Sequence, residues 1–258
     1  TVFATTLAMQ SVCFGWAFYR LKRMFPGFPL VSGALFRETV WFGLKIYLAA
    51  FFYFLLSRTS LVMVKYMLGE EQAGYFSAAS VLGDKLILLP IIMGTILFPR
   101  LAVLDNPEDK WRMAAKAAWG AFASALFFGI IMVSMAGFVI RLLYGAEFIP
   151  AVPAVFWLMP GLILLTFGII YQNYLGASGK VALTIFPPLI AFGVNILCGF
   201  LLIGKYGITG AACAASLAFG AMSLISWTIS YWKRNDPGNK EVNEQAIKQT
   251  VFPSDEYK

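Results

Sequence analysis

Seven long apolar stretches constrain the fold of this chain more than any other feature. Each approaches or exceeds the length of a bilayer-crossing helix, which needs about 20 mostly apolar residues. Short connectors with glycine and charged residues separate them. The stretches cover approximately residues 2–18, 40–68, 75–101, 114–140, 152–174, 181–203 and 208–232. Strands of an outer-membrane barrel would instead alternate over about 10 residues. The pattern predicts an all-α polytopic membrane helix bundle with about seven transmembrane helices.

The composition excludes most soluble functions. Of the 258 residues, 60% are apolar or aromatic and 13% are charged, whereas soluble domains are about 25% charged. The sequence has no histidine, which is the commonest metal ligand and general base. Its three cysteines lie far apart in apolar runs, and no phosphate-binding loop, nucleophile elbow or zinc spacing occurs. We therefore expect a transporter and not an enzyme, with no cofactor, no metal and no nucleic acid partner.

Lysine and arginine are distributed unevenly between the two sides of the predicted bundle. The side with few of them has only Arg141 and Lys205, together with Glu70, Glu71 and Glu147. The other side has Arg20, Lys22, Arg23, Arg37, Arg100, Lys110, Arg112, Lys116, Lys180, Lys233 and Arg234. Connectors rich in Lys and Arg stay in the cytoplasm. We therefore expect a multi-pass protein of the bacterial inner membrane with a cytoplasmic C-terminus.

The two ends of the sequence differ in character. The chain begins at Thr1 inside the first apolar stretch, without an initiator methionine or a charged signal-peptide head. We expect an N-terminal portion to be missing, and the alternative is a natural seven-span protein. The polar segment that follows the last apolar stretch is predicted to be a disordered cytoplasmic tail.

Four groups of motifs follow one another along the chain. They are residues 73–79 (AGYFSAA) with 89–90 (LP) and 97–101 (LFPRL), residues 143–148 (LYGAEF) with 158–161 (LMPG), residues 174–180 (YLGASGK), and residues 195–197 (NIL) with 202–212 (LIGKYGITGAA). Their order resembles the C-terminal half of the polysaccharide-transporter family, the O-antigen and lipid-linked oligosaccharide flippases of the multidrug/oligosaccharidyl-lipid/polysaccharide exporter superfamily. The resemblance covers about residues 40–232.

The resemblance implies a protein of two facing six-helix lobes. Residues 1–39 would hold the last helix of the missing N-terminal lobe and a basic cytoplasmic connector, residues 40–232 the C-terminal lobe, and residues 233–258 the tail. The implied function is alternating-access movement of a polyprenyl-diphosphate-linked oligosaccharide from the cytoplasmic to the outer leaflet, for cell-surface polysaccharide such as lipopolysaccharide. The implied partners are this lipid-linked substrate, the bilayer and the missing lobe. Many relatives carry an aspartate where this sequence reads Arg58-Thr59-Ser60, so this chain lacks that carboxylate for ion coupling.

Two alternative functions remain open at this point. A multidrug antiporter of the same superfamily would favour an acidic cavity for cationic drugs, but the ionisable candidates within the membrane are one acid, Asp84, and four cations, Lys45, Arg58, Lys65 and Lys85. A membrane polysaccharide polymerase or ligase would need a larger outside loop than residues 141–151.

Ionisable residues within spans are candidates for function, because a charge at the bilayer centre costs at least ~2.5–3.5 kcal/mol. Lys45 lies near the cytoplasmic end and is expected to extend to the headgroups. Arg58 and Asp84 lie 13 residues before and after Glu71, so we expect them at similar depth and paired. This pair either fixes the helix hairpin or takes part in substrate binding.

Further candidates complete the predicted substrate-binding set. Lys65 and Lys85 have no acid at matching depth in the sequence, so we expect them, with Arg58, to form a cationic patch for an anionic ligand between the second and third spans. Three amides, Gln172, Asn173 and Asn195, either bond between helices or contact sugar hydroxyls.

The charge asymmetry makes the topology testable. Single cysteines at Glu71 and Lys180, in a background without the native cysteines, are expected to react with a membrane-impermeant thiol reagent from opposite sides of a sealed vesicle. Comparing right-side-out with inverted vesicles measures this. Reaction of both cysteines from the same side would contradict the topology.

Overall fold

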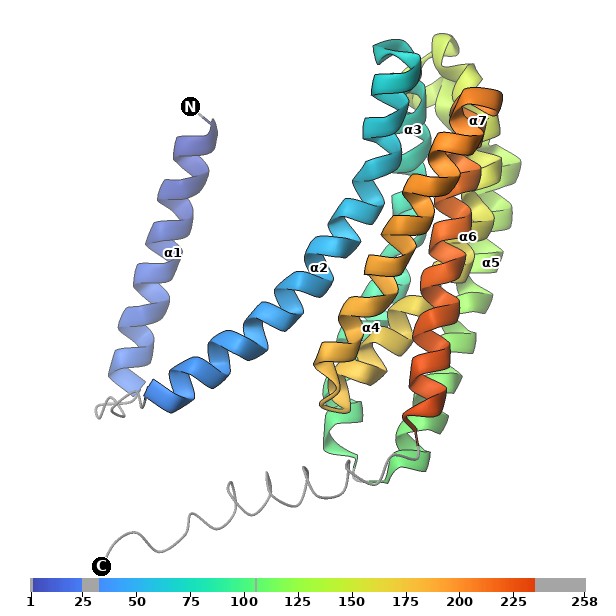
Figure 1. Cartoon of the computed structure of the whole chain (residues 1–258). Helices are drawn as coiled ribbons and strands as arrows, with labels where there is room; N and C mark the ends of the chain where they lie inside the picture. The colour runs from blue at the N-terminus through green and yellow to red at the C-terminus, as the bar shows by residue number, and fades with distance from the viewer. Residues whose placement is uncertain (1, 25–32, 105, 235–258) are drawn as a thin grey trace, which may run out of the picture. The chain divides into compact units, whose positions relative to one another are not determined.

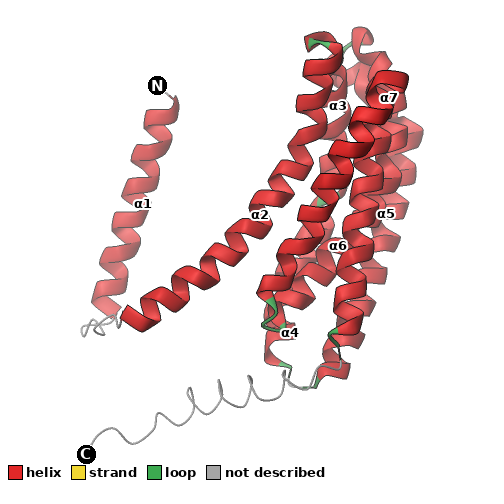
Figure 2. Ribbon diagram, in the orientation of Figure 1, coloured by secondary structure: helices red, strands yellow, loops and turns green. Residues whose placement is uncertain are grey.

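The computed structural model describes residues 2–24, 33–104 and 106–234. All regular elements in these ranges are helices (Figures 1 and 2). Their bounds are α1 (Val2–Met24), α2 (Gly33–Leu68), α3 (Glu70–Leu86), α4 (Leu88–Val103), α5 (Pro107–Tyr144), the 3-10 helix η1 (Ala146–Ala151), α6 (Val152–Ala177), the 3-10 helix η2 (Val181–Ile185) and α7 (Phe186–Trp232). The prediction of an all-α polytopic membrane protein is confirmed, whereas the predicted tail lies almost entirely outside the described residues.

The described part contains five helical segments that are long and apolar enough to cross a membrane. They are Phe36–Leu68, Glu70–Val103, Pro107–Tyr144, Ala146–Ala177 and Val181–Trp232. This differs from the predicted seven for two reasons. α1 is helical but is not among the five, so its crossing stays a prediction. The last two predicted spans both lie within Val181–Trp232.

α7 reverses its direction at a glycine, which is why one segment holds two predicted spans. Gly207 has φ 58° and ψ −138°. Residues with a Cβ atom rarely adopt this conformation, whereas glycine adopts it readily. Figure 1 shows the two arms of α7 running in opposite directions beside each other. A Cβ atom added to Gly210 would lie 2.2 Å from the carbonyl oxygen of Leu202, so the turn is tight.

The chain divides into two compact units, Thr1–Phe42 and Gly43–Lys258. The first unit contains α1 and the beginning of α2, and the second contains the remainder of α2 and all later helices. The domain boundaries expected from the sequence, after residues 39 and 232, stay predictions. The candidate site lies within the second unit.

Small residues allow α6 to approach the second arm of α7 closely. A Cβ atom added to Gly161 would lie 2.2 Å from the Cα atom of Ser216, and one added to Gly168 would lie 2.9 Å from Ser223 Oγ. The two serines also donate hydrogen bonds across the interface, Ser216 to the Trp157 carbonyl and Ser223 to the Leu164 carbonyl at 2.7 Å. Close packing and side-chain hydrogen bonds of this kind hold membrane helices together.

Gly161 should therefore be intolerant of even one added methyl group. Gly161→Ala is expected to destabilise the bundle by about 1–3 kcal/mol, because the backbone of α7 must move to accept the Cβ atom. Gly137→Ala is the matched control, since a Cβ atom there meets nothing within 4 Å. Thermal unfolding in one detergent measures the difference. Equal melting temperatures for the two variants would refute this account of the α6–α7 contact.

Candidate functional site

The segment Glu70–Val103 is interrupted near its middle. α3 ends at Leu86 and α4 begins at Leu88. Pro90 has no N–H group to donate to the Leu86 carbonyl, so an uninterrupted helix would lose this hydrogen bond. Ile87, the residue at the break, is buried, with 9% of its surface exposed. Irregular backbone at membrane depth is tolerated where protein covers it or where it lines a cavity, and both conditions are met here.

A small cavity lies beside this break, and we call it the central cavity. Its volume is about 30 Å³, enough for one water molecule. Residues of α2, α3, α6 and α7 line it together with Ile87. Its polar lining comes from two helices, with Tyr53, Ser57 and Ser60 on α2 and Ser80 and Asp84 on α3. The structure therefore brings hydroxyl groups and one carboxylate together beside the α3–α4 break, with Ser60 buried and with Ser57 and Asp84 exposed.

The hydroxyl groups of the three serines donate their hydrogen bonds to other protein groups and not to the contents of the cavity. Ser57 Oγ donates to the Phe54 carbonyl at 2.9 Å, and Ser80 Oγ donates to the Phe76 carbonyl at 2.9 Å. Ser60 Oγ donates to Asn195 Oδ1 at 3.0 Å. A hydroxyl group that has donated its proton still offers oxygen lone pairs. The central cavity is therefore rich in acceptors, and it suits a cation, a proton or a water molecule that donates.

Arg58 and Asp84 do not form the ion pair that we expected. The charges of Arg58 and Lys85 both act on the Asp84 carboxylate, but neither side chain makes a salt bridge with it in the described part of the chain. Successive residues of a helix point about 100° apart. Ser57 and Ser60 of α2 line the central cavity, whereas the neighbouring Arg58 does not.

Lys65 has an acidic partner, so the expectation that it has none was wrong. Its Nζ atom lies 3.1 Å from Glu70 Oε1, and both side chains are mostly exposed. α2 ends at Leu68 and α3 begins at Glu70, so the turn between them brings the two charges together. This exposed pair lies at the end of the helix hairpin and contributes about 0–1 kcal/mol.

Lys85 faces a different part of the bundle from Asp84. It borders a groove of about 330 Å³ whose other lining residues are apolar and come from α3 and α5. One residue further along a helix means about 100° of rotation, so Asp84 lines the central cavity and Lys85 points toward α5. The expected cationic patch of Arg58, Lys65 and Lys85 between α2 and α3 is therefore not formed.

The three candidate amides all form hydrogen bonds within the protein. Asn195 is fully buried and donates to the Leu56 carbonyl at 3.1 Å, in addition to accepting from Ser60. Gln172 Nε2 donates to Ser226 Oγ of α7 at 3.4 Å. Asn173 Nδ2 donates to the Ile169 carbonyl of its own helix at 2.8 Å. The contacts of Gln172 and Asn195 favour the reading in which amides connect helices.

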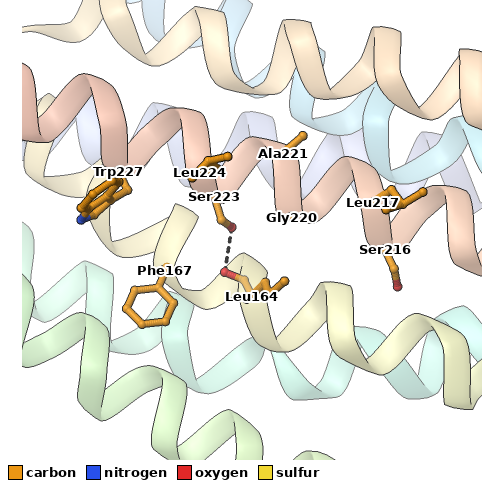
Figure 3. A pocket seen from close by; sticks show the side chains of 9 residues that line it. All are labelled: Leu164, Phe167, Ser216, Leu217, Gly220, Ala221, Ser223, Leu224 and Trp227. Carbon is orange, nitrogen blue, oxygen red and sulfur yellow. Dashed lines mark hydrogen bonds between the residues drawn. The ribbon is translucent and has the colours of Figure 1, made fainter.

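A wider groove of about 580 Å³ lies between α6 and α7 (Figure 3). Leu164 and Phe167 line it from α6, and residues between Ser216 and Trp227 line it from α7. No charged side chain borders it, and its two serines already donate to carbonyl groups of α6, as the dashed line from Ser223 shows. This groove suits hydrocarbon and not a charged head group.

Sequence reasoning found part of the central cavity. It identified Asp84 as an ionisable candidate within a span, but it did not identify Tyr53 or Ser57. The signal for Ser57 was its place in a polar cluster in the middle of an apolar span. In the described residues, no three His, Cys, Asp or Glu side chains gather where they could hold a metal ion.

Comparisons with known proteins give the family. A curated relative is an uncharacterized membrane protein of Methanocaldococcus jannaschii, 25% identical over 229 residues, which covers 83% of this chain and 43% of the relative. The chain therefore spans less than half the length of this relative. No solved structure matches. The family described as polysaccharide biosynthesis protein matches residues 4–153. Because this match covers more than half of the sequence, the chain belongs to the polysaccharide biosynthesis protein family.

Proposed function

We propose that this chain is part of a flippase that moves a polyprenyl-diphosphate-linked oligosaccharide from the cytoplasmic to the outer leaflet by alternating access. The observation that carries the proposal is the break between α3 and α4, which puts Asp84 and a hydroxyl-lined cavity near the middle of a segment, Glu70–Val103, that is long and apolar enough to cross a membrane. In secondary transporters, discontinuous helices at this depth form substrate and ion sites. A helix that only anchors a protein needs neither a break nor an ionisable residue at its centre.

Arg58 and Lys85 are the cations that we assign to the diphosphate, each meeting it at a different place on the bundle, because the two side chains do not form one patch. A diphosphate loses hydration when it enters the membrane, and charge-assisted hydrogen bonds from Arg and Lys replace part of it. Both side chains are exposed on the bundle, and neither has an ion-pair partner in the described part of the chain. Lys65 is a weaker candidate, because Glu70 already meets its charge at the end of the hairpin.

Asp84 is the group that we assign to ion coupling. It is the carboxylate of the central cavity, whose serines present acceptor oxygens. A proton or a small cation bound there would neutralise it, whereas an anionic substrate would not. Two cations act near this one acid, which disfavours the alternative of a multidrug antiporter for cationic drugs. We also propose transport over catalysis, because no described connector between α2 and α7 is long enough to form a catalytic domain.

The cationic assignment predicts the effect of charge removal in the complete protein. Arg58→Ala and Lys85→Ala are each expected to slow flipping about tenfold or more, since a hydrogen bond to a charged group contributes about 1.5–3 kcal/mol. Lys205→Gln, which removes an exposed cation in the turn of α7, is the control and should flip at the wild-type rate. Protection of a fluorescent lipid-linked oligosaccharide from an external quencher in proteoliposomes measures the rate. Wild-type rates for both alanine variants would refute the assignment.

The coupling assignment predicts a separate result for Asp84. Asp84→Asn keeps the shape of the side chain and leaves no ion-pair partner uncompensated, so we expect normal membrane abundance together with loss of transport. Abundance is measured by immunoblotting of membranes and transport by the same flipping assay. A variant that is poorly produced but flips normally per molecule would show that Asp84 has a structural role and not a coupling role.

A further inference from the structure

A groove with apolar walls and one charged residue lies at the opposite end of the bundle from the Lys65–Glu70 pair. It is a groove of about 220 Å³ between α4 and α5, lined by Met93, Ile96, Leu97 and Arg100 of α4 and by Met113 and Ala117 of α5. We call it the Arg100 groove. Its walls are apolar except for one guanidinium group, so it has the polarity of a lipid and not that of a sugar or a peptide strand.

The Arg100 groove lies within one leaflet. The eight residues from Met93 to Arg100 extend over about 10 Å of helix, which is less than half of the ~30 Å hydrocarbon thickness. Arg100 lies one turn before the end of α4 at Val103. The groove therefore begins at the end of the bundle and runs inward, along the direction in which an acyl chain extends from its headgroup.

Charged residues place the same end of the bundle near the membrane interface. Arg112, in the first turns of α5, forms an ion pair with Glu108, and the guanidinium group of Arg234, just after the end of α7, lies 5.6 Å from the ring of Trp111. Charged side chains near the ends of membrane helices extend to the headgroups. Arg112 precedes Met113 of the groove by one residue, so Arg100 lies near the depth of lipid phosphates.

The charge of Arg100 is available to a ligand. Its side chain is exposed and makes no salt bridge with a carboxylate in the residues that the structure describes. The nearby Arg112 differs, because its Nε atom lies 3.3 Å from Glu108 Oε1. A guanidinium group can hold two phosphate oxygens in a fork. The charge of Arg100 is complementary to a phosphate, while the walls below it are complementary to a hydrocarbon chain.

We propose that the Arg100 groove binds one anionic phospholipid of the membrane, with its phosphate on Arg100 and one acyl chain along α4 and α5. The site is separate from the central cavity and does not depend on the proposed flippase function. Anionic lipids are favoured over zwitterionic ones because the groove has one cation and no carboxylate among its lining residues. The bound lipid would fill the seam between α4 and α5 and stabilise their contact.

Native mass spectrometry of the full chain in detergent, titrated with phosphatidylglycerol, tests the proposal. Wild-type protein is expected to bind a first molecule of phosphatidylglycerol more tightly than further molecules of the same lipid. It is also expected to bind that first molecule more tightly than it binds phosphatidylcholine. Arg100→Gln is expected to weaken the first site about tenfold or more. Arg112→Gln, a matched loss of charge outside the groove, should leave the affinity unchanged. Equal weakening by both variants would mean general surface electrostatics and would overturn the proposal.

Two further measurements test separately the binding of the lipid headgroup and that of its acyl chain. Ala117→Leu keeps Arg100 but fills the groove, so we expect it also to weaken binding, and a wild-type affinity would overturn the placement of the acyl chain. Inorganic phosphate should not compete at equal concentration, and full competition would show a simple phosphate site instead. If Arg100→Gln fails to fold, the Ala117→Leu variant and the comparison of the two lipids on wild-type protein still decide the proposal.

Discussion

Every backbone N–H and C=O group inside the hydrocarbon region must find a hydrogen-bond partner within the protein, and the rest of this structure depends on that constraint. It explains why the described elements are helices and why the departures from regular helix are few and local. At the α3–α4 break, Ile91 N–H donates to the Ile87 carbonyl at 3.1 Å, so α4 starts at once. At the end of α2, Gly69 N–H donates to the Lys65 carbonyl at 3.1 Å.

Helix association in this bundle depends on close approach more than on apolar burial. Lipid tails are as apolar as leucine, so burying a leucine between helices gains little. Gly161 and Gly168 instead bring α6 within reach of Ser216 and Ser223 of α7, whose hydroxyl groups donate to α6 carbonyls. The buried Asn195 makes the corresponding connection between α7 and α2. Polar groups thus connect the helices.

The same scarcity of water gives the charged residues their importance. Asp84 lines a cavity with the volume of one water molecule, and the charges of Arg58 and Lys85 act on it without forming a salt bridge in the described residues. Lys65 and Arg100 lie toward the two ends of the bundle, where a carboxylate or a lipid phosphate can meet their charge. Asp84, Arg58 and Lys85 thus lie away from the ends of the bundle, whereas Lys65 and Arg100 lie toward them.

The sequence by itself determined the class of fold and most of the helices, because apolar length is a local property and a helix advances about 1.5 Å per residue whatever surrounds it. It also indicated the turn at Gly207 and the ionisable residues within the spans. Only the tertiary structure decided which side chains meet. Asp84 and Lys85 are neighbours in sequence but face different cavities, and Lys65 pairs with Glu70 across a turn. These outcomes depend on how each helix is rotated and where α3 breaks, and packing between distant segments sets both.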